Sequence, residues 1–336
     1  MSRVKKKSIH EFISLLNPSS STYISGQDLA DKAGISRSAV WKRIKRLRRH
    51  GYKIESQHGL GYRMKGKTEF PVPWELKRRL RTSFIGKEIH YKESADSTQR
   101  IALYIAENKP DPQGTVVIAE QQKKGRGRLK RQWFSPPGGL WLSVILKPEI
   151  PTGMITLLPL CAAVAVSHAV RDCTSLEAKL KWPNDVMLSG RKVAGILVDI
   201  SAEAERVNYA IIGIGINANI DSHEISGRLQ HHRVELQVTS LRTELGHDVN
   251  RLELTSHVLA NLEKYFLQLE NEGALPILKE WKKNTEMFGR QVQVMQNGKL
   301  VNRGTAIGLG EDGSLIIRTE HGKDKSIISG DILVRY

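Results

Sequence analysis

Arginines set among glycines form the segment of this chain best suited to chemistry, Gly125-Arg126-Gly127-Arg128. The segment runs on through further basic residues to Trp133 and lacks the apolar periodicity of a core element. Its glycines permit close approach of the backbone to a ligand, and its arginines offer forked donors that match carboxylate or phosphate groups. A flexible basic surface loop has the same composition, and composition alone favours that simpler explanation.

Three polar motifs follow at the ends of expected strands. They are Lys181-Trp182-Pro183-Asn184-Asp185, Lys192-Val-Ala-Gly195 and Gly213-Ile-Gly215-Ile-Asn217. Proline ends the strand that carries Lys181, and Lys192 opens the next strand. Any one of these motifs is a weak signal, so their order and spacing carry the argument.

The elements around these motifs predict a central α+β domain over residues 67–284. Helices are expected near residues 98–107, 154–172, 251–269 and 275–284, and strands near residues 114–119, 140–146, 192–200 and 209–216. Consecutive strands joined by short turns are typically antiparallel neighbours. This pattern favours an α+β sheet over a doubly wound parallel one.

The net charge of +17 is concentrated near the N-terminus. Residues 1–66 hold 15 Lys and Arg against 4 Asp and Glu. A local excess of this kind is typical of a protein that binds a polyanion. On charge alone, a merely solvated basic surface is an equal alternative.

The local pattern of residues 1–66 resolves that choice in favour of a winged helix-turn-helix. Residues 8–16 predict an amphipathic helix, Ser25 and Ser36 cap two further helices, and Gly34 makes the turn between them. An alternating segment over residues 52–64 predicts a hairpin wing. The last helix is basic, and we expect it to contact DNA through Ser36, Arg37, Ser38, Trp41, Lys42 and Lys45.

Two further motif matches do not fit their surroundings. The segment Gly61–Thr68 has the letters of a P-loop, but prolines at 71 and 73 prevent a helix from starting there. The segment Gly308–Gly313 has the letters of a dinucleotide fingerprint, but short strands surround it. We therefore reject both.

Short strands dominate the end of the chain. They are expected at residues 292–295, 300–307, 315–319 and 327–334, separated by Asn-Gly, Asp-Gly and Gly-Asp turns. This pattern predicts a small β-barrel over residues 285–336. A barrel of this size could by itself bind a peptide or a nucleic acid.

Composition bounds the remaining possibilities. With only Cys161 and Cys173, a disulfide framework and a structural zinc site are not expected. No apolar run approaches the ~18–20 residues of a membrane span, and no apolar signal core follows the basic N-terminus. We expect a cytoplasmic protein with no membrane partner.

Taken together, the loop from Gly125 to Trp133 and the three later motifs resemble those of biotin–protein ligases, in the family's order and spacing. The winged helix resembles that of the bifunctional members, the biotin operon repressors. The resemblance spans essentially the whole chain. It implies a central mixed α/β catalytic domain of the class II aminoacyl-tRNA-synthetase type and an SH3-like C-terminal barrel.

The resemblance also implies roles for individual residues. The residues that it assigns to biotin are Ser97, Thr98, Gln99, Gln122, Arg126, Gly127, Arg128 and Lys192. Trp133 is expected at the adenine side, with Asn184, Asp185 and Asn217 in the nucleotide and metal region. Lys192, Arg126 and Arg128 are the expected catalytic residues. Lys181 could instead be a surface lysine, and Asp185 a turn cap.

These roles agree with the chemistry that the resemblance implies. The carboxylate of biotin attacks the α-phosphate of ATP, so fixed cations in a water-poor site should lower the barrier. Mg²⁺ would accompany ATP, without a metal-binding motif in the chain itself. The second nucleophile is a lysine of a biotin carboxyl carrier protein, so the chain needs no catalytic triad.

The same resemblance implies repression of biotin genes. Two polar loops, residues 121–132 and 221–233, are expected to be mobile and to be ordered by biotinyl-AMP. That ordering would favour a homodimer that binds operator DNA. A lipoate-transferring relative and a non-catalytic regulator are the alternatives. The intact arginine loop argues against both, and Lys192 argues further against the regulator.

Overall fold

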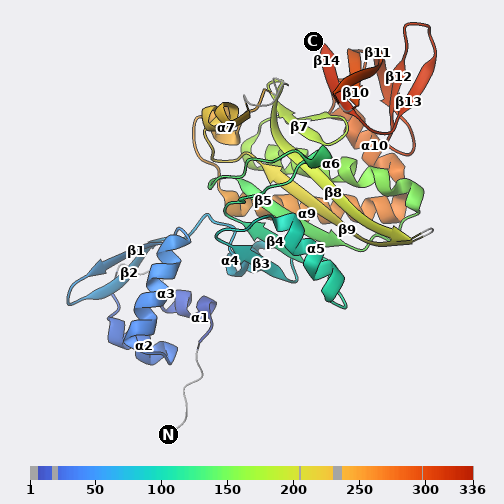
Figure 1. Cartoon of the computed structure of the whole chain (residues 1–336). Coiled ribbons are helices and arrows are strands. Elements are labelled where there is room, and N and C mark those ends of the chain that lie inside the picture. The colour runs from blue at the N-terminus through green and yellow to red at the C-terminus, as the bar shows by residue number, and fades with distance from the viewer. Residues whose placement is uncertain (1–6, 17–21, 204–205, 230–236, 297, 336) are drawn as a thin grey trace. The chain divides into compact units, whose positions relative to one another are not determined.

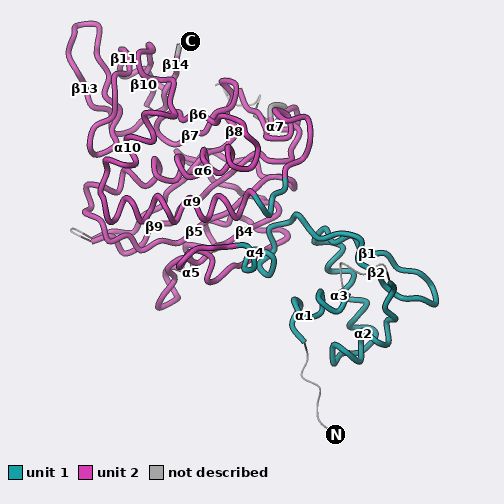
Figure 2. The backbone as a smooth tube through the Cα atoms, turned by 180° about the vertical axis from the view of Figure 1, so that it is seen from behind, with its two compact units in different colours: residues 1–79, 250–253 teal, residues 80–249, 254–336 magenta. Residues whose placement is uncertain are grey.

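The fold was analysed in a computed structural model that describes residues 7–16, 22–203, 206–229, 237–296 and 298–335. The chain forms two compact units (Figure 2). The first comprises Met1–Arg79 with Asn250–Glu253, and the second comprises Leu80–Val249 with Leu254–Tyr336. Each unit is described by itself.

Unit 1 begins with the three helices expected from the sequence, α1 (Ile9–Leu15), α2 (Gly26–Ala33) and α3 (Arg37–Arg49). Ser25 and Ser36 accept hydrogen bonds from the backbone N–H groups of Asp28 and Ala39, as N-caps do. Gly34 ends α2 with φ of 64°, a conformation that favours glycine. The wing is an antiparallel hairpin of β1 (Lys53–Gln57) and β2 (Gly61–Gly66).

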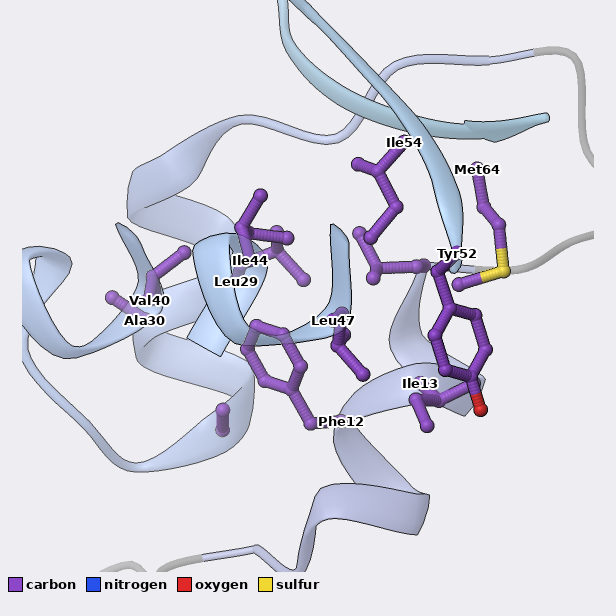
Figure 3. Packing of buried hydrophobic residues seen from close by; sticks show 12 residues of the cluster. Phe12, Ile13, Leu29, Ala30, Val40, Ile44, Leu47, Tyr52, Ile54 and Met64 are labelled. Atoms are coloured by element: carbon purple, nitrogen blue, oxygen red, sulfur yellow. The ribbon is translucent and has the colours of Figure 1, made fainter. Parts of the chain in front are cut away.

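One apolar cluster holds these elements together (Figure 3). Phe12 of α1, Leu29 of α2 and Ile44 and Leu47 of α3 are at most 1% exposed, and Met64 of β2 closes the cluster. The short helix α4 (Pro73–Arg79) belongs to the same unit. Its Trp74 and Glu75 both bond the hydroxyl of Tyr52, at 2.7 and 2.6 Å. The first six residues of the Gly61–Thr68 segment form β2 and no helix starts at its end, so the rejection of a P-loop is confirmed.

Unit 2 is built on a seven-stranded sheet with the order β3-β4-β5-β9-β8-β7-β6 (Figure 1). Its strands are β3 (Ile89–Lys92), β4 (Val116–Ala119), β5 (Leu140–Leu146), β6 (Lys179–Lys181), β7 (Asp185–Leu188), β8 (Arg191–Glu203) and β9 (Arg206–Ile216). All neighbours are antiparallel except β3 and β4, which pair in parallel. The expected α+β class is confirmed, and β3 and β7 are strands that were not predicted.

Helices cover both faces of this sheet. The helix α5 (Thr98–Asn108) packs against β4, β5 and β9, with Ala102 in a buried cluster with Val117, Ile145 and Ile211. The helix α6 (Leu158–Thr174) covers the other face, with α9 (Arg251–Glu272) alongside (Figures 1 and 2). The remaining helices are α7 (Ser222–Leu229), α8 (Leu241–Leu245) and α10 (Ala274–Lys283), with 3₁₀ turns η1 (Arg128–Lys130) and η2 (Thr152–Leu157).

The stretch Thr152–Thr174 corrects one expectation from the sequence. By length and composition it is apolar enough to cross a membrane. Two-thirds of its most apolar window, 67%, is buried inside the protein, because α6 packs against β6, β7, β8 and β9. Its apolar character therefore serves the core of unit 2.

The end of the chain forms a five-stranded antiparallel sheet with the order β13-β12-β11-β10-β14. Its strands are β10 (Gln291–Gln296), β11 (Lys299–Leu309), β12 (Leu315–Arg318), β13 (Asp324–Ile327) and β14 (Asp331–Arg335). The expected turn at Gly330-Asp331 separates β13 from β14, but the strand bounds of 327–334 are wrong, because β13 begins at Asp324 and ends at Ile327. No helix follows Gly313, so the rejection of a dinucleotide fingerprint is confirmed.

Candidate functional site

A buried chain of hydrogen bonds links α5 to the sheet beneath it. The side-chain oxygen of Gln122 accepts from the backbone N–H and the hydroxyl of Thr98, at 2.8 and 3.1 Å. The hydroxyl of Ser143 on β5 lies 2.9 Å from the Thr98 hydroxyl and 2.9 Å from the side-chain oxygen of Gln99. The side-chain NH₂ of Gln99 donates to the Ile211 carbonyl at 2.9 Å. Four of the predicted site residues are thus brought into one cluster when Ser97 is included.

Ser97 is the exception in this cluster. It precedes α5 but makes no side-chain cap, and its buried hydroxyl has no hydrogen-bond partner in the described part of the chain. The residue is 1% exposed. Buried polar groups are normally paired, so an orphan here marks a place where a ligand could supply the partner.

The arginine loop has a defined, folded-back conformation. The N–H of Gly127 donates to the carbonyl of Arg131, and the N–H of Trp133 to that of Gly125. Between them, Leu129 and Lys130 adopt φ of 53° and 61° in the left-handed region. A β-carbon on Gly125 would lie 2.3 Å from the carbonyl oxygen of Trp133, so this position requires glycine. The mobility expected from composition is a prediction that this geometry does not test.

Each arginine of the loop has a different partner. Arg126 forms an ion pair of 2.9 Å with Asp199 on β8. Arg128 donates to the side-chain oxygen of Asn184 at 3.1 Å and reaches the carbonyl of Gly330 at 3.5 Å. Burial lowers the pKa of Arg128 from its ordinary value. Arg131 forms an ion pair with Asp331, so the C-terminal sheet fastens two of the three arginines.

The indole of Trp133 packs against glycines of two neighbouring strands, and these glycines are called the glycine floor. Gly195 of β8 and Gly215 of β9 are paired directly, so they lie on the same face of the sheet. A β-carbon on Gly195 would come within 2.9 Å of the indole, and one on Gly215 within 2.7 Å of its Nε1. Gly213, on the same face, similarly lies against Gln99. The Nε1 atom is buried and has no partner among the described residues.

Lys192 contacts both Trp133 and Asp185. Its Nζ lies 5.1 Å from the centre of a Trp133 ring and 2.5 Å from a carboxylate oxygen of Asp185. The charge of Lys192 also acts on Lys181 of β6. The pKa of Lys181 is lowered, first by burial and further by Lys192, although the charges of Asp185 and Asp331 tend to raise it.

Two buried asparagines, Asn184 and Asn217, hold charged residues of the site in position. Asn184, 7% exposed, donates to the Ile196 carbonyl and accepts from Arg128, so it positions the arginine. Asn217, 2% exposed, donates to the Thr239 carbonyl at 3.0 Å. That bond ties the end of β9 to a segment whose Val238 bridges to Lys192. Asn217 therefore helps to fix the segment that pairs with the backbone of Lys192.

The structure gathers some predicted residues and separates others. Lys192 lies beside Trp133 and pairs with Asp185, whose charge also acts on Arg128, whereas Arg126 is held by Asp199, seven residues along β8 from Lys192. In an extended strand that separation is about 23 Å between α-carbons. The predicted loop over residues 221–233 is only partly described, because residues 230–236 lie outside the described residues.

Sequence reasoning missed the partners of the loop. Asp199, Gly330 and Asp331 hold its arginines, and Ser143 links the two polar residues of α5. Asp331 lies 200 residues from Arg131 in the sequence, so no local pattern could reveal it. Asp199 sits in an apolar strand, and its isolated charge there was the one available signal.

The charges suit a ligand that carries phosphate. Asp185 pairs with Lys192, and the charges of Asp185 and Asp331 act on both Arg128 and Lys181, so three cations gather around these two carboxylates. No group of three or more His, Cys, Asp or Glu among the described residues could hold a metal ion.

The exposed face of α3 in unit 1 carries a second set of predicted residues. Arg37, Ser38, Lys42 and Lys45 are exposed, and Trp41 is 54% exposed with Lys45 5.0 Å from its ring centre. Ser36 is exposed and caps the helix. Two other basic residues are structural, since Arg43 bonds the Lys7 carbonyl and Arg48 the Ile54 carbonyl, both at 2.9 Å.

Comparison with known protein families divides the chain in three. The biotin/lipoate A/B protein ligase family matches residues 91–217. An HTH domain matches residues 9–63, and the biotin protein ligase C terminal domain matches residues 287–335. These ranges include the polar cluster, the arginine loop and the basic helix described above.

Two individual relatives match over almost the full chain, and a solved structure matches about three-quarters of it. The bifunctional ligase/repressor BirA of Bacillus subtilis (strain 168) is 36% identical over 324 residues, covering 96% of this chain and 97% of the relative. The protein of the same name from Escherichia coli (strain K12) is 30% identical, covering 93% and 92%. The biotin protein ligase of Aquifex aeolicus in complex with biotin and ATP has 30% identity and a TM-score of 0.61, covering 74% of this chain and 99% of that one.

Proposed function

Because this chain belongs to the family of bifunctional biotin–protein ligase/repressors, we propose that it activates biotin with ATP and transfers it to a lysine of a biotin carboxyl carrier protein. The N-terminal HTH domain adds DNA binding, so the same chain represses the genes of biotin supply. The convergence of Arg128, Lys181 and Lys192 around Asp185, with Lys192 beside Trp133, is the single observation that carries the ligase assignment.

Biotin lies, in this proposal, on the face of the sheet covered by α5. Ser97 offers a buried hydroxyl without a partner, and the cluster of Thr98, Gln99 and Gln122 is preorganised by hydrogen bonds. Such groups fix the orientation of a polar ring system, while the surrounding apolar sheet accepts its hydrocarbon part. Gly127 lets the loop backbone approach the ligand.

In the activation step, the biotin carboxylate oxygen attacks the α-phosphorus of ATP, and pyrophosphate leaves. Negative charge builds on the phosphate oxygens, and we assign its stabilisation to Lys192 and Arg128. Arg126 must leave Asp199 before it can contribute. Trp133 offers an aromatic surface for adenine, supported by the orphaned donor at its Nε1. Asn184 positions Arg128, and Asn217 supports Lys192.

Mg²⁺ fits the site only as a partner of the phosphates. The carboxylates that face the cations are Asp185 and Asp331, each already in an ion pair. Mg²⁺ commonly binds through one or two carboxylates together with substrate phosphates and water. We therefore assign Asp185 to the metal region, and the ion would neutralise charge on the departing pyrophosphate.

Repression requires a symmetric pair of DNA-binding domains. We propose a homodimer formed through the outer edge of β8 when biotinyl-AMP is bound. Beyond Gly195, no described strand pairs with β8 on that side, and Ile200 is 41% exposed there. An unpaired strand edge is a template for pairing with a second chain. A two-fold dimer would present two winged helices to a two-fold operator.

Finer features of the fold follow the same assignment. We assign the central sheet of residues 67–284 to the class II aminoacyl-tRNA-synthetase type and residues 285–336 to an SH3-like barrel. Residues 1–66 form the winged helix-turn-helix, with Ser36, Arg37, Ser38, Trp41, Lys42 and Lys45 facing DNA. We place the protein in the cytoplasm, where the carrier protein and the operator both occur.

A direct test uses a purified carrier domain. The protein, ATP and biotin should add one biotin to wild-type carrier and none to a carrier whose acceptor lysine is replaced by arginine. Intact-mass spectrometry measures both. Absence of the mass increase with wild-type carrier would overturn the assignment.

A further inference from the structure

The main chain of Lys192 is held by pairing on both of its sides. On one side β8 pairs with β7. On the other side β9 has ended, and residues 237–239 pair with β8 in its place. The N–H of Lys192 donates to the Gln237 carbonyl, and the Lys192 carbonyl accepts from the N–H of Thr239, both at 2.9 Å. The position of Lys192 therefore depends on what holds β7 and this segment.

One carboxylate, that of Glu244 on α8, contacts both of these neighbours. Its Oε1 accepts hydrogen bonds from Nη2 of Arg191 at 2.6 Å and from the hydroxyl of Thr239 at 2.5 Å. Its Oε2 accepts from the hydroxyl of Ser189 at 2.9 Å. The side chain of Glu244 is only 10% exposed. A single, largely buried carboxylate thus joins the turn before Lys192 to the segment that pairs with it.

The turn that Glu244 contacts has an unusual backbone conformation. Ser189 and Gly190 form the two-residue connection between β7 and β8, with φ of 50° and 73°. Two-residue hairpin turns with positive φ at both positions favour asparagine or glycine, so serine is a less suitable residue for the first position. The hydrogen bond from Ser189 to Glu244 stabilises this conformation and so the register of the hairpin.

That register decides where the side chain of Lys192 points. Side chains alternate between the two faces of a sheet, so a slip of one residue would move Lys192 to the other face. In the observed register its Nζ lies 2.5 Å from a carboxylate oxygen of Asp185 and 5.1 Å from the centre of a Trp133 ring. Glu244 can therefore act on the ammonium group through the backbone of the hairpin.

We propose that Glu244 is a positioning residue for Lys192 in the activation of biotin. The inference rests on the proposed function. The ammonium group stabilises the charge on the α-phosphate only when it lies at the reacting oxygens, and a misplacement of about 1 Å can cost on the order of 10²-fold in rate. Glu244 fixes both the turn and the paired segment, so Lys192 meets the phosphate without a rearrangement of its strand.

Glu244→Gln tests this role, because it keeps the size of the side chain and removes its charge. The matched control is Asp248→Asn, the same change in an exposed carboxylate that pairs with Arg242. Single-turnover formation of biotinyl-AMP, with the full-length protein in excess over biotin, measures activation. Both substitutions are then repeated in a Lys192→Ala background.

We expect Glu244→Gln to lower the rate of biotinyl-AMP formation about tenfold in the otherwise wild-type protein. In the Lys192→Ala background the same substitution should change the rate less than twofold, since the group that it positions is gone. Asp248→Asn should leave the rate unchanged in both backgrounds.

A tenfold loss in both backgrounds would overturn the proposal, because Glu244 would then act on the fold and not through Lys192. An unchanged rate in Glu244→Gln would overturn it as well. If Glu244→Gln does not fold, Thr239→Val carries the same comparison, since it removes one hydroxyl donor to Glu244 from a fully buried position. Failure of the wild-type protein to form biotinyl-AMP would instead refute the proposed function.

Discussion

Lys192 and Asp185 form a largely buried ion pair, with Nζ 2.5 Å from the carboxylate oxygen and side-chain exposures of 14% and 19%. The pair holds the ammonium beside Trp133 at the point where β7 and β8 meet. A phosphate that arrives there can replace the carboxylate as the partner of the lysine. The site is therefore preorganised for an anion.

Replacing Lys192 by alanine should lower biotin-dependent pyrophosphate exchange by roughly 10²–10³, the usual cost of removing one such donor. The matched control is Lys179→Ala, which removes a lysine from β6 whose partner is the exposed Glu177. The control should keep near wild-type exchange. A folded Lys192→Ala protein with wild-type exchange would refute the assigned role.

The glycine floor predicts a steric effect on the tryptophan. Gly215→Ala should displace Trp133 and lower exchange about tenfold, because overpacking costs about 1–3 kcal/mol. In a Trp133→Leu background the same substitution should add little, since the clashing ring is gone. Gly308→Ala, a strand glycine with open space around it, should be silent. Additive losses in the double variant would contradict the proposed contact.

The lowered pKa of Lys181 predicts a pH profile. The protonated form carries the charge that favours phosphate, so kcat/KM for ATP should fall as pH rises through that pKa. The fall should occur below the ordinary lysine value of about 10.4. Lys181→Arg should move the fall to higher pH, because arginine stays protonated. Lys179→Arg serves as control, and an identical profile for all three proteins would exclude Lys181 from ATP binding.

The exposed face of α3 predicts a salt effect on DNA binding. Lys42→Ala and Lys45→Ala should each weaken binding to the operator and reduce the slope of log affinity against log salt by about one. Lys32→Ala removes an exposed lysine from α2 and should leave the slope unchanged. Biotinylation should be unaffected throughout. A slope that none of the three variants alters would place the DNA contact elsewhere.

The unpaired edge of β8 predicts a route to the dimer. Proline lacks the N–H that an edge strand offers a partner, so Ile200→Pro should weaken dimerisation. Sedimentation without ligand, with biotin plus ATP, and with a non-hydrolysable adenylate analogue would measure it. Wild-type protein should dimerise most with the last two. Equal dimerisation in all three conditions would remove the link between the ligand and the dimer.

Local signals in the sequence predicted most elements of the fold. Ser25, Gly34 and Ser36 located the helix-turn-helix, because caps and left-handed turns depend on single residues. The turn at Gly330-Asp331 was predicted, but the strand β13 before it was missed, since it depends on pairing with β12. The same limit hid Asp331 and Asp199, whose contacts with the arginine loop exist only after distant segments have packed.

Substrate choice tests the central claim most directly. Exchange between pyrophosphate and ATP is measured with biotin, with lipoate and without either acid. The account predicts rapid exchange with biotin and background rates with lipoate. Exchange with lipoate alone would assign the chain to the lipoate-transferring relatives, and no exchange with either acid would identify a regulator that does not catalyse.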